Sequence, residues 1–133
     1  MRMVGGDLLG YLRSMRRRLD FIAEHHQLLE IAPDGPLALF MPRTAPLPEE
    51  PSGGLGRFVE ERGLDEQVAA FVYPDRRGSG YGLSRFKDDA RMEFTRIESE
   101  PDVHFAHARG FVAKSSATKP ERLRELLQLA YVG

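Results

Sequence analysis

One short segment constrains the fold of this chain more than any other. Gln67–Tyr73 is a nearly continuous apolar run, and it ends at Pro74-Asp75. An apolar run without alternation is typical of a strand that is buried on both faces, at the centre of a sheet. We therefore expect other strands on both sides of this one, and helices layered over the sheet.

Helical periodicity marks both ends of the chain. Between residues 7 and 26, apolar side chains recur at steps of four and three along one helix face: Leu8, Leu12, Met15, Leu19 and Ile22. Asp7 is expected to be the N-cap of this helix or an acidic residue of its first turn. The C-terminal helix is predicted from the apolar stripe Leu123, Leu126, Leu127, Ala130 and Tyr131. Thr118 and Glu121 have capping-box spacing at its start.

Short strands and loops fill the middle of the chain. Strands are predicted at residues 28–31, 37–41, 67–73, 81–86, 103–107 and 111–113, with a further short one at 94–97. The prolines between residues 42 and 51 predict an extended loop, and a short helix is expected over residues 55–62. The sequence thus predicts a single α+β domain over residues 1–133, with mixed α/β layers. Its mixed sheet of about five strands is expected to be flanked by the N- and C-terminal helices.

The composition excludes several classes of function. The chain has 133 residues and no cysteine, which excludes a disulfide framework, a thiolate zinc site and a cysteine nucleophile. Its 19 basic and 20 acidic residues give a net charge of −1, whereas proteins that grip a long duplex usually carry a large basic excess. A local phosphate site is compatible with this balance. Since no apolar run reaches the roughly 18–20 residues that span a bilayer and no signal-peptide pattern opens the chain, we expect a cytoplasmic protein without a membrane partner.

The histidines form two pairs that are poorly spaced for one metal ion. His25 and His26 are adjacent on a predicted helix, so their side chains point about 100° apart. His104 and His107 have an odd spacing on a predicted strand, which indicates opposite faces of the sheet. We therefore expect no metal site in this chain alone.

The segment that begins at His107 is the strongest candidate for a binding site. The strand that carries His107 is followed by Arg109-Gly110, by Lys114 and by the start of the last helix. Gly110 lets a ligand approach the backbone. A phosphate-sized anion is predicted between this turn and the helix, bound by His107, Arg109, Lys114, Lys119 and the free amides of the helix start. Arg85 can reach the same surface if its strand is a neighbour. The alternative is a bulged strand and a capped helix without a ligand.

Residues 105–112 resemble the signature of a known family. The segment Phe105-Ala-His-Ala-Arg-Gly-Phe-Val is similar to the Phe-Val-His-Ala-Ser-Gly-Phe-Ile motif near the end of the melanocyte-proliferating-gene family, a branch of the DHH-superfamily phosphoesterases. Met3–Arg18 resembles the family's helix, Leu29–Leu39 its turn and strand before a Pro-rich loop, and Val68–Leu83 its central hairpin. The resemblance spans most of the chain, and the motif around His107 is its specific part.

This resemblance implies a substrate class and a role. The chain would correspond to the C-terminal, DHH-associated half of such an enzyme, which binds a phosphoester substrate, RNA or a nucleotide, with His107 and Arg109 on the phosphate. Divalent manganese or magnesium would be held by an N-terminal DHH catalytic half. No cofactor and no catalytic residue is therefore expected in this chain, and the whole protein would be a metal-dependent phosphodiesterase, a 3′–5′ exoribonuclease.

The alternative function is a protein-interaction or oligomerisation domain with no ligand chemistry. A strand at the edge of a sheet exposes unpaired backbone groups, which can pair with those of a second copy. Residues 103–107 and 94–97 are the predicted edge strands. A homodimer through one of them is expected under this alternative.

Overall fold

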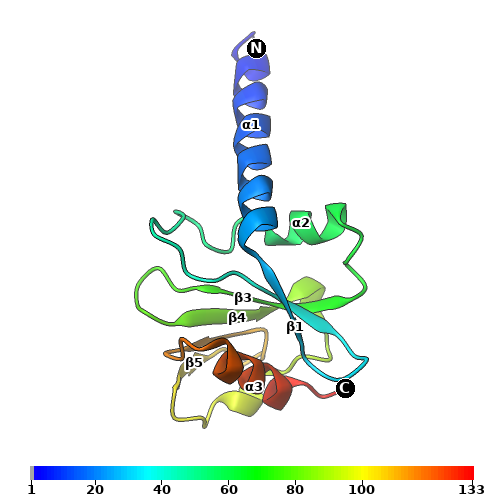
Figure 1. Ribbon diagram of the computed structural model, residues 1–133, viewed down its shortest axis with the longest axis vertical. Helices are drawn as coiled ribbons and strands as arrows, with labels where there is room; N and C mark the ends of the chain where they lie inside the picture. Colours follow the sequence, from blue (N-terminus) through cyan, green and yellow to red (C-terminus); the bar gives the residue numbers. More distant parts are fainter. Residues whose placement is uncertain (1) are drawn as a thin grey trace.

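The protein folds around one mixed sheet of six strands (Figure 1). This computed structural model describes the backbone of residues 2–133 and the side chains of residues 9–133. The strands are β1 (Gln27–Glu30), β2 (Leu37–Phe40), β3 (Val68–Pro74), β4 (Tyr81–Arg85), β5 (Val103–Ala106) and β6 (Val112–Ser115). Their order in the sheet is β1-β2-β3-β4-β6-β5; β2 and β3 run parallel, and the other neighbouring pairs run antiparallel. The predicted α+β class is confirmed, with one strand more than expected.

The apolar run that anchors the sequence prediction becomes β3. This strand lies between β2 and β4, as Leu39 pairs with Phe71 on one side and Val72 pairs with Leu83 on the other. Its residues Val68, Ala69, Ala70 and Val72 are at most 1% exposed. The prediction of a central strand buried on both faces is therefore confirmed.

Helices cover the two faces of the sheet unequally. One face is covered by α3 (Pro120–Ala130) and by the 3-10 helix η2 (Phe94–Ile97). The other face carries α2 (Leu55–Glu61) and the C-terminal end of α1 (Arg2–His25). In Figure 1, α1 and α2 lie above the sheet and α3 lies below it. The helices on the α1 side pack against β2 and β3, and this leaves part of that face open.

Helix α1 stands out from the rest of the molecule (Figure 1). It begins at Arg2, so Asp7 lies within the helix and is not the N-cap that the sequence predicted. The side chains of Asp7 and Leu8 lie outside the described residues. Towards the end of α1, Leu19 and Ile22 are buried against α2. The base of the helix is therefore part of the core, whereas the side chains of residues 9–14 are exposed.

Two predictions about the C-terminal third are wrong. Residues 94–97 form a 3-10 helix and not a strand, because Phe94 and Ile97, three residues apart, are both buried in the same layer, and three residues make one 3-10 turn. Helix α3 has Lys119 as its N-cap, and no side chain caps it. The predicted capping box is therefore absent, because Thr118 lies one residue before the N-cap.

The Pro-rich stretch is an extended loop, as predicted, and α1 anchors it. The guanidinium of Arg18 donates to the carbonyl oxygen of Gly53 at 2.6 Å and to that of Pro51 at 2.8 Å. Burial lowers the pKa of Arg18, and the nearby carboxylate of Glu50 opposes this shift. The loop thus packs on α1 instead of moving freely. None of the described helices has the length and apolar character needed to cross a membrane.

Candidate functional site

Strands β4, β6 and β5 carry helices on one face only. Strand pairing places Gly82 opposite Lys114, and Lys114 opposite Phe105, so these three residues share the uncovered face. Ala113, the neighbour of Lys114 in β6, points the other way and is buried beneath α3 and η2. Phe105 remains 44% exposed on the uncovered face. We call the surface of β4, β6 and β5 on this side the open face.

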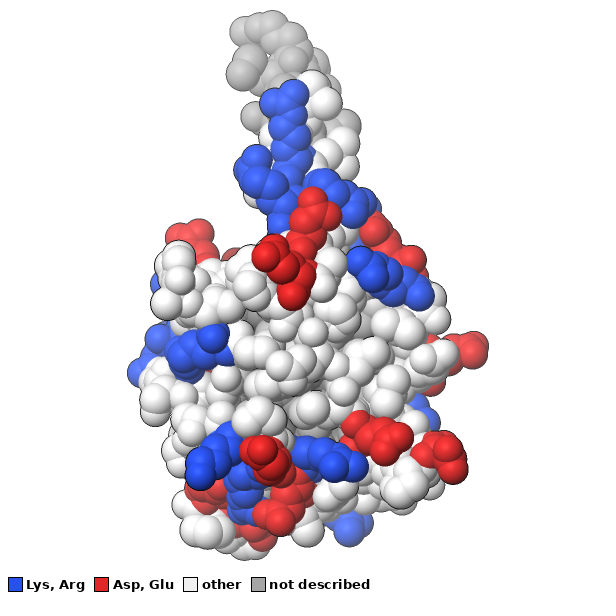
Figure 2. Space-filling view, viewed as in Figure 1, with Lys and Arg blue, Asp and Glu red and all other residues white. Residues whose placement is uncertain are grey.

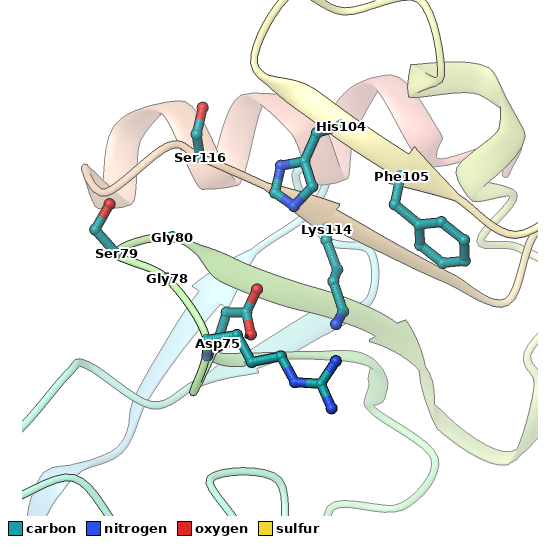
Figure 3. Close-up of a pocket in the computed structure, with 9 residues that line it drawn as sticks. Asp75, Gly78, Ser79, Gly80, His104, Phe105, Lys114 and Ser116 are labelled. Carbon is teal, nitrogen blue, oxygen red and sulfur yellow. Dashed lines mark hydrogen bonds between the residues drawn. The ribbon is translucent and has the colours of Figure 1, made fainter.

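A cavity of about 570 Å³ lies where the open face meets the loop between β3 and β4. Its lining includes Asp75, Arg77 and Ser79 from the loop, His104 and Phe105 from β5, and Lys114 from β6. In Figure 3, Lys114 points from β6 toward the loop that carries Asp75, while His104 and Phe105 stand side by side on β5. Two cationic side chains thus share this cavity with one carboxylate and one imidazole.

A β-bulge places His104 in the cavity. Val103 pairs with Ser115 and Phe105 with Lys114, so His104 is an extra residue between two consecutive residues of β6. This irregularity breaks the alternation that the sequence argument assumed for His104 and His107. The prediction that these two histidines lie on opposite faces of the sheet is therefore wrong, since His104 lines the cavity on the open face and the ring of His107 lies beside that of Phe105.

An aromatic row continues from the cavity along the open face. The ring centroids of Phe105 and His107 are 6.5 Å apart in an edge arrangement, and those of His107 and Phe111 are 4.3 Å apart. Phe111 is 38% exposed. The backbone N–H of Arg109 donates to Nδ1 of His107 at 3.1 Å. Because Nδ1 is the acceptor, the neutral ring carries its proton on Nε2.

Arg43, from the Pro-rich loop, holds the loop that forms one wall of the cavity. Its guanidinium donates to the carbonyl oxygens of Asp75 at 3.0 Å and of Gly80 at 2.7 Å. Its backbone N–H donates to the hydroxyl of Tyr81 at 3.0 Å. Within the loop, the carboxylate of Asp75 accepts the backbone N–H of Arg77 at 3.1 Å. Hydrogen bonds from Arg43 therefore hold both ends of this loop, at Asp75 and at Gly80.

Two glycines beside the cavity allow neighbouring groups to approach the backbone closely. A Cβ on Gly80 would lie 1.9 Å from the carbonyl oxygen of Ser115, so only glycine lets the loop approach β6 this closely. A Cβ on Gly82 would lie 2.7 Å from the ring of Tyr73. The Tyr73 ring therefore packs directly over the backbone of β4 and borders the open face.

The structure brings together two of the predicted site residues. Lys114 lies on the open face, and so does His107, whose backbone N–H continues the ladder by donating to Val112. Arg85 is not part of this surface. It pairs with Ala70 on the covered side, its side chain is 13% exposed, and it is bound to Asp88 and to the carbonyl oxygen of Met92.

Arg109 and Gly110 form the turn between β5 and β6, where the N–H of Gly110 donates to the carbonyl oxygen of His107 at 2.8 Å. Gly110 has a φ of +76°, and a Cβ there would lie 1.8 Å from the carboxylate of Glu93. The close approach that glycine permits is therefore made by the protein's own Glu93. That carboxylate lies against the turn, where the sequence predicted a bound anion.

The predicted anion site between this turn and the start of α3 is wrong, because the two lie at opposite ends of β6. The turn precedes Val112, and the start of α3 follows Ser115. The turn instead lies near the C-terminal end of α3. The backbone N–H of Glu93 donates to the carbonyl oxygen of Ala130, and the backbone N–H of Phe94 donates to that of Gly110. The helix start and Arg109 cannot act on one phosphate.

Sequence reasoning missed His104, Phe105 and Arg77 as lining residues. The strand pattern around His104 contains no glycine or proline that would signal a bulge. For Phe105 the sequence gives no such signal, because Val103, Phe105 and Ala106 are apolar and typical of a buried strand. Arg77 lies in a loop whose placement depends on Arg43, which is distant in sequence.

A charged cluster anchors the start of β5 to α3. The guanidinium of Arg122 donates to the carboxylates of Asp102 at 2.8 Å and Glu100 at 2.8 Å, and it also pairs with Glu125. The hydrogen bond from Arg122 is the main reason why the pKa of Asp102 lies below its ordinary value. The hydroxyl of Ser115 donates to the backbone carbonyl of Asp102 at 2.8 Å. These bonds hold the strand that presents His104 and Phe105.

Among residues with described side chains, no three histidine, aspartate or glutamate residues form a group that could hold a metal ion. Comparisons with models of protein families, with curated proteins and with solved structures found no match to this chain.

Proposed function

We propose that the open face binds a phosphoester ligand, a nucleotide or a short single-stranded nucleic acid. The observation that carries this proposal is the exposed ring of Phe105 beside Lys114 and His104 in a cavity of about 570 Å³. A phosphate would lie in the cavity, and a base would stack on the aromatic row.

The cavity supplies donors of the kind that phosphate binds. Lys114 offers an ammonium group and Arg77 a planar fork of N–H donors. His104 adds a ring nitrogen that can take part in a hydrogen bond. The Asp75 carboxylate opposes an anion, but it is engaged with the backbone N–H of Arg77. A weak, salt-sensitive site is therefore expected.

The aromatic row supplies a stacking surface next to this phosphate position. Every base has a π-face, so stacking on an exposed ring is tolerant of sequence and contributes about 1–3 kcal/mol per base. The exposed rings of Phe105 and Phe111 flank His107, whose Nε2–H remains a donor. This combination of rings and cations on a sheet is the pattern of proteins that bind single strands.

The resemblance of residues 105–112 to the DHH-superfamily motif supports the same ligand class. In such an enzyme this domain would bind substrate, while an N-terminal catalytic half would hold manganese or magnesium and carry out the phosphodiester hydrolysis. By this proposal the chain is not catalytic alone and works in the cytoplasm.

The test is a titration of fluorescein-labelled RNA and DNA hexamers at low salt, followed by anisotropy. Lys114→Gln is expected to weaken binding several-fold and to reduce the slope of log affinity against log salt by about one. Phe105→Ala is expected to weaken binding by about fivefold or more, since it removes one stacking surface. Lys114→Gln should retain the unfolding midpoint of the parent, and Phe105→Ala should lower the free energy of unfolding by less than about 1 kcal/mol.

The matched control is Lys119→Gln, which removes an exposed lysine at the start of α3, outside the cavity. It should leave affinity nearly unchanged. Absence of binding at millimolar ligand, or equal losses for Lys114→Gln and Lys119→Gln, would contradict the proposal.

A further inference from the structure

The loop between β3 and β4 forms one wall of the cavity, although its composition favours flexibility. Residues 76–79 are exposed, and the loop contains Gly78 and Gly80 on either side of Ser79. Glycine loses more conformational freedom than any other residue when it is ordered. In Figure 3 these three residues border the cavity on the side opposite Phe105. Order that the free chain already imposes on this loop removes a cost that ligand binding would otherwise bear.

Arg43 supplies this order by joining the two ends of the loop. One nitrogen of its guanidinium donates to the carbonyl oxygen of Asp75 at 3.0 Å and to that of Gly80 at 2.7 Å. The backbone N–H of Asp75 donates to the same carbonyl oxygen of Gly80 at 2.9 Å. Hydrogen bonds from a charged donor are stronger than those between neutral groups. The bonds from Arg43 therefore add to a backbone closure that is weaker without them.

Arg43 is itself held by a buried part of the sheet. Its backbone N–H donates to the hydroxyl of Tyr81 at 3.0 Å. Its guanidinium carbon lies 5.8 Å from the centroid of the Tyr81 ring, a distance at which a cation is attracted to a ring face. Tyr81 is 5% exposed, and its ring packs against that of Phe40 with the centroids 5.4 Å apart. Arg43 thus connects the exposed loop to the core.

On the basis of the function proposed for the open face, we infer that Arg43 is a positioning residue, which raises the affinity of the cavity for phosphate without binding the phosphate itself. The lining of the cavity includes Arg77 and Ser79 but not Arg43. By holding the ends of the loop at Asp75 and Gly80, Arg43 keeps Arg77 and Ser79 on the cavity wall before a ligand arrives. The Pro-rich loop therefore acts on the site from outside it.

The first test compares Arg43→Met with the parent in the anisotropy titration of the labelled RNA hexamer. Arg43 is exposed, so the substitution leaves no hole in the core. We expect binding at low salt to weaken about threefold to tenfold, because the loop must now be ordered by the ligand. The slope of log affinity against log salt should remain that of the parent, since no phosphate contact is lost. Lys114→Gln, in contrast, should reduce this slope by about one.

Arg96→Met is the matched control. Arg96 also donates to a backbone carbonyl, that of Leu129 at 3.0 Å, but it lies in η2, on the face of the sheet that α3 covers. Basic and acidic groups are interspersed over the side of the body that Figure 2 shows, and salt screens distant charges. The loss of this arginine should therefore leave the affinity for the hexamer nearly unchanged.

The second test measures amide hydrogen exchange in the chain without a ligand. The amide of Asp75 is bonded to Gly80, and that of Arg77 to the carboxylate of Asp75. Both are expected to exchange several-fold faster in Arg43→Met than in the parent, because the loop opens more often. The amides of β3 should exchange at the rate of the parent, which shows that the fold is intact.

The outcomes separate the role of Arg43 from the function of the site. If the parent does not bind the hexamer, the proposed function fails, and the role of Arg43 fails with it. If the parent binds but Arg43→Met binds equally well, or if exchange at Asp75 and Arg77 is unchanged, Arg43 is not a positioning residue and the proposed function stands. A salt slope that falls by about one in Arg43→Met would assign Arg43 to the phosphate contacts, which also overturns the inference.

Discussion

Strands β3 and β6 lie in the same sheet, yet they show two different ways of being buried. In β3 both faces are covered, and nearly every side chain is apolar and buried. In β6 the pattern alternates: Ala113 and Ser115 are buried under α3, while Val112 and Lys114 reach the open face. The difference shows that packing dictates residue type only where a second layer exists. Where that layer is missing, the chain is free to carry groups that bind a ligand.

The covered and the open side of β4 and β6 also contribute differently to the candidate site. The covered side of β4 and β6 supplies rigidity, through the layer that includes Leu83 and Ala113. The open side supplies Phe105, His107 and Lys114. A binding surface built on strands that are well packed on their other face keeps its side chains in place without a ligand.

The largest expected effect contrasts one phenylalanine on each side of the sheet. Phe94→Ala removes a fully buried ring beneath the sheet and should lower the free energy of unfolding by about 3–5 kcal/mol. Phe105→Ala removes a ring that is 44% exposed and should lower it by less than about 1 kcal/mol. Urea denaturation followed by circular dichroism measures both. Equal losses would mean that the open face is itself covered in solution.

A smaller effect is expected at the turn that ends the aromatic row. In Gly110→Ala, an alanine must adopt a positive φ, and its Cβ must displace the Glu93 carboxylate. We therefore expect the free energy of unfolding to fall by about 2 kcal/mol or more. Gly63→Ala is the matched control, because Gly63 also has a positive φ but a Cβ there meets nothing within 4 Å. It should cost about 1 kcal/mol, the conformational part alone.

The measurement is again the urea midpoint of the two glycine variants. Equal midpoints would show that Glu93 moves away without cost. In that case the turn could accept an external anion in place of Glu93, which would restore part of the site expected from the sequence.

Periodicity was enough to predict the architecture but not the site. The apolar run of β3 and the helices at the two ends depend on local spacing, and the structure confirms them. The C-terminal stripe is buried within α3, whereas in the N-terminal stripe Leu19 and Ile22 are buried and Leu12 is exposed. The site depends on features that local spacing does not encode. A bulge brings His104 to the open face, the register of β4 turns Arg85 to the covered side, and β6 separates Gly110 from the start of α3. Lys114 and His107 were both predicted for the site from their nearness in sequence, and the pairing of β5 with β6 places both on the open face.

The smallest expected effect tests how the open half of the sheet is held to α3. In the folded chain the hydrogen bond from Arg122 keeps the pKa of Asp102 below its ordinary value, which is about 3.9 in an unfolded chain. The unfolded chain therefore takes up this proton at a higher pH than the folded chain. The Asp102–Arg122 pair contributes fully to the free energy of unfolding above about pH 4 and loses its contribution as the pH falls through the lowered pKa of Asp102.

Arg122→Met should lower the free energy of unfolding by about 1 kcal/mol at neutral pH, since the side chains of the pair are only about one quarter exposed. The difference from the parent should shrink below about pH 4. Arg124→Met, which removes an exposed pair with Glu30 at 4.0 Å and a hydrogen bond to the backbone carbonyl of Glu30 at 2.8 Å, should lower the free energy of unfolding without this pH dependence, because the carbonyl does not titrate. A pH-independent loss at Arg122 would mean that its methylene packing, and not its charge, secures β5 and the open face.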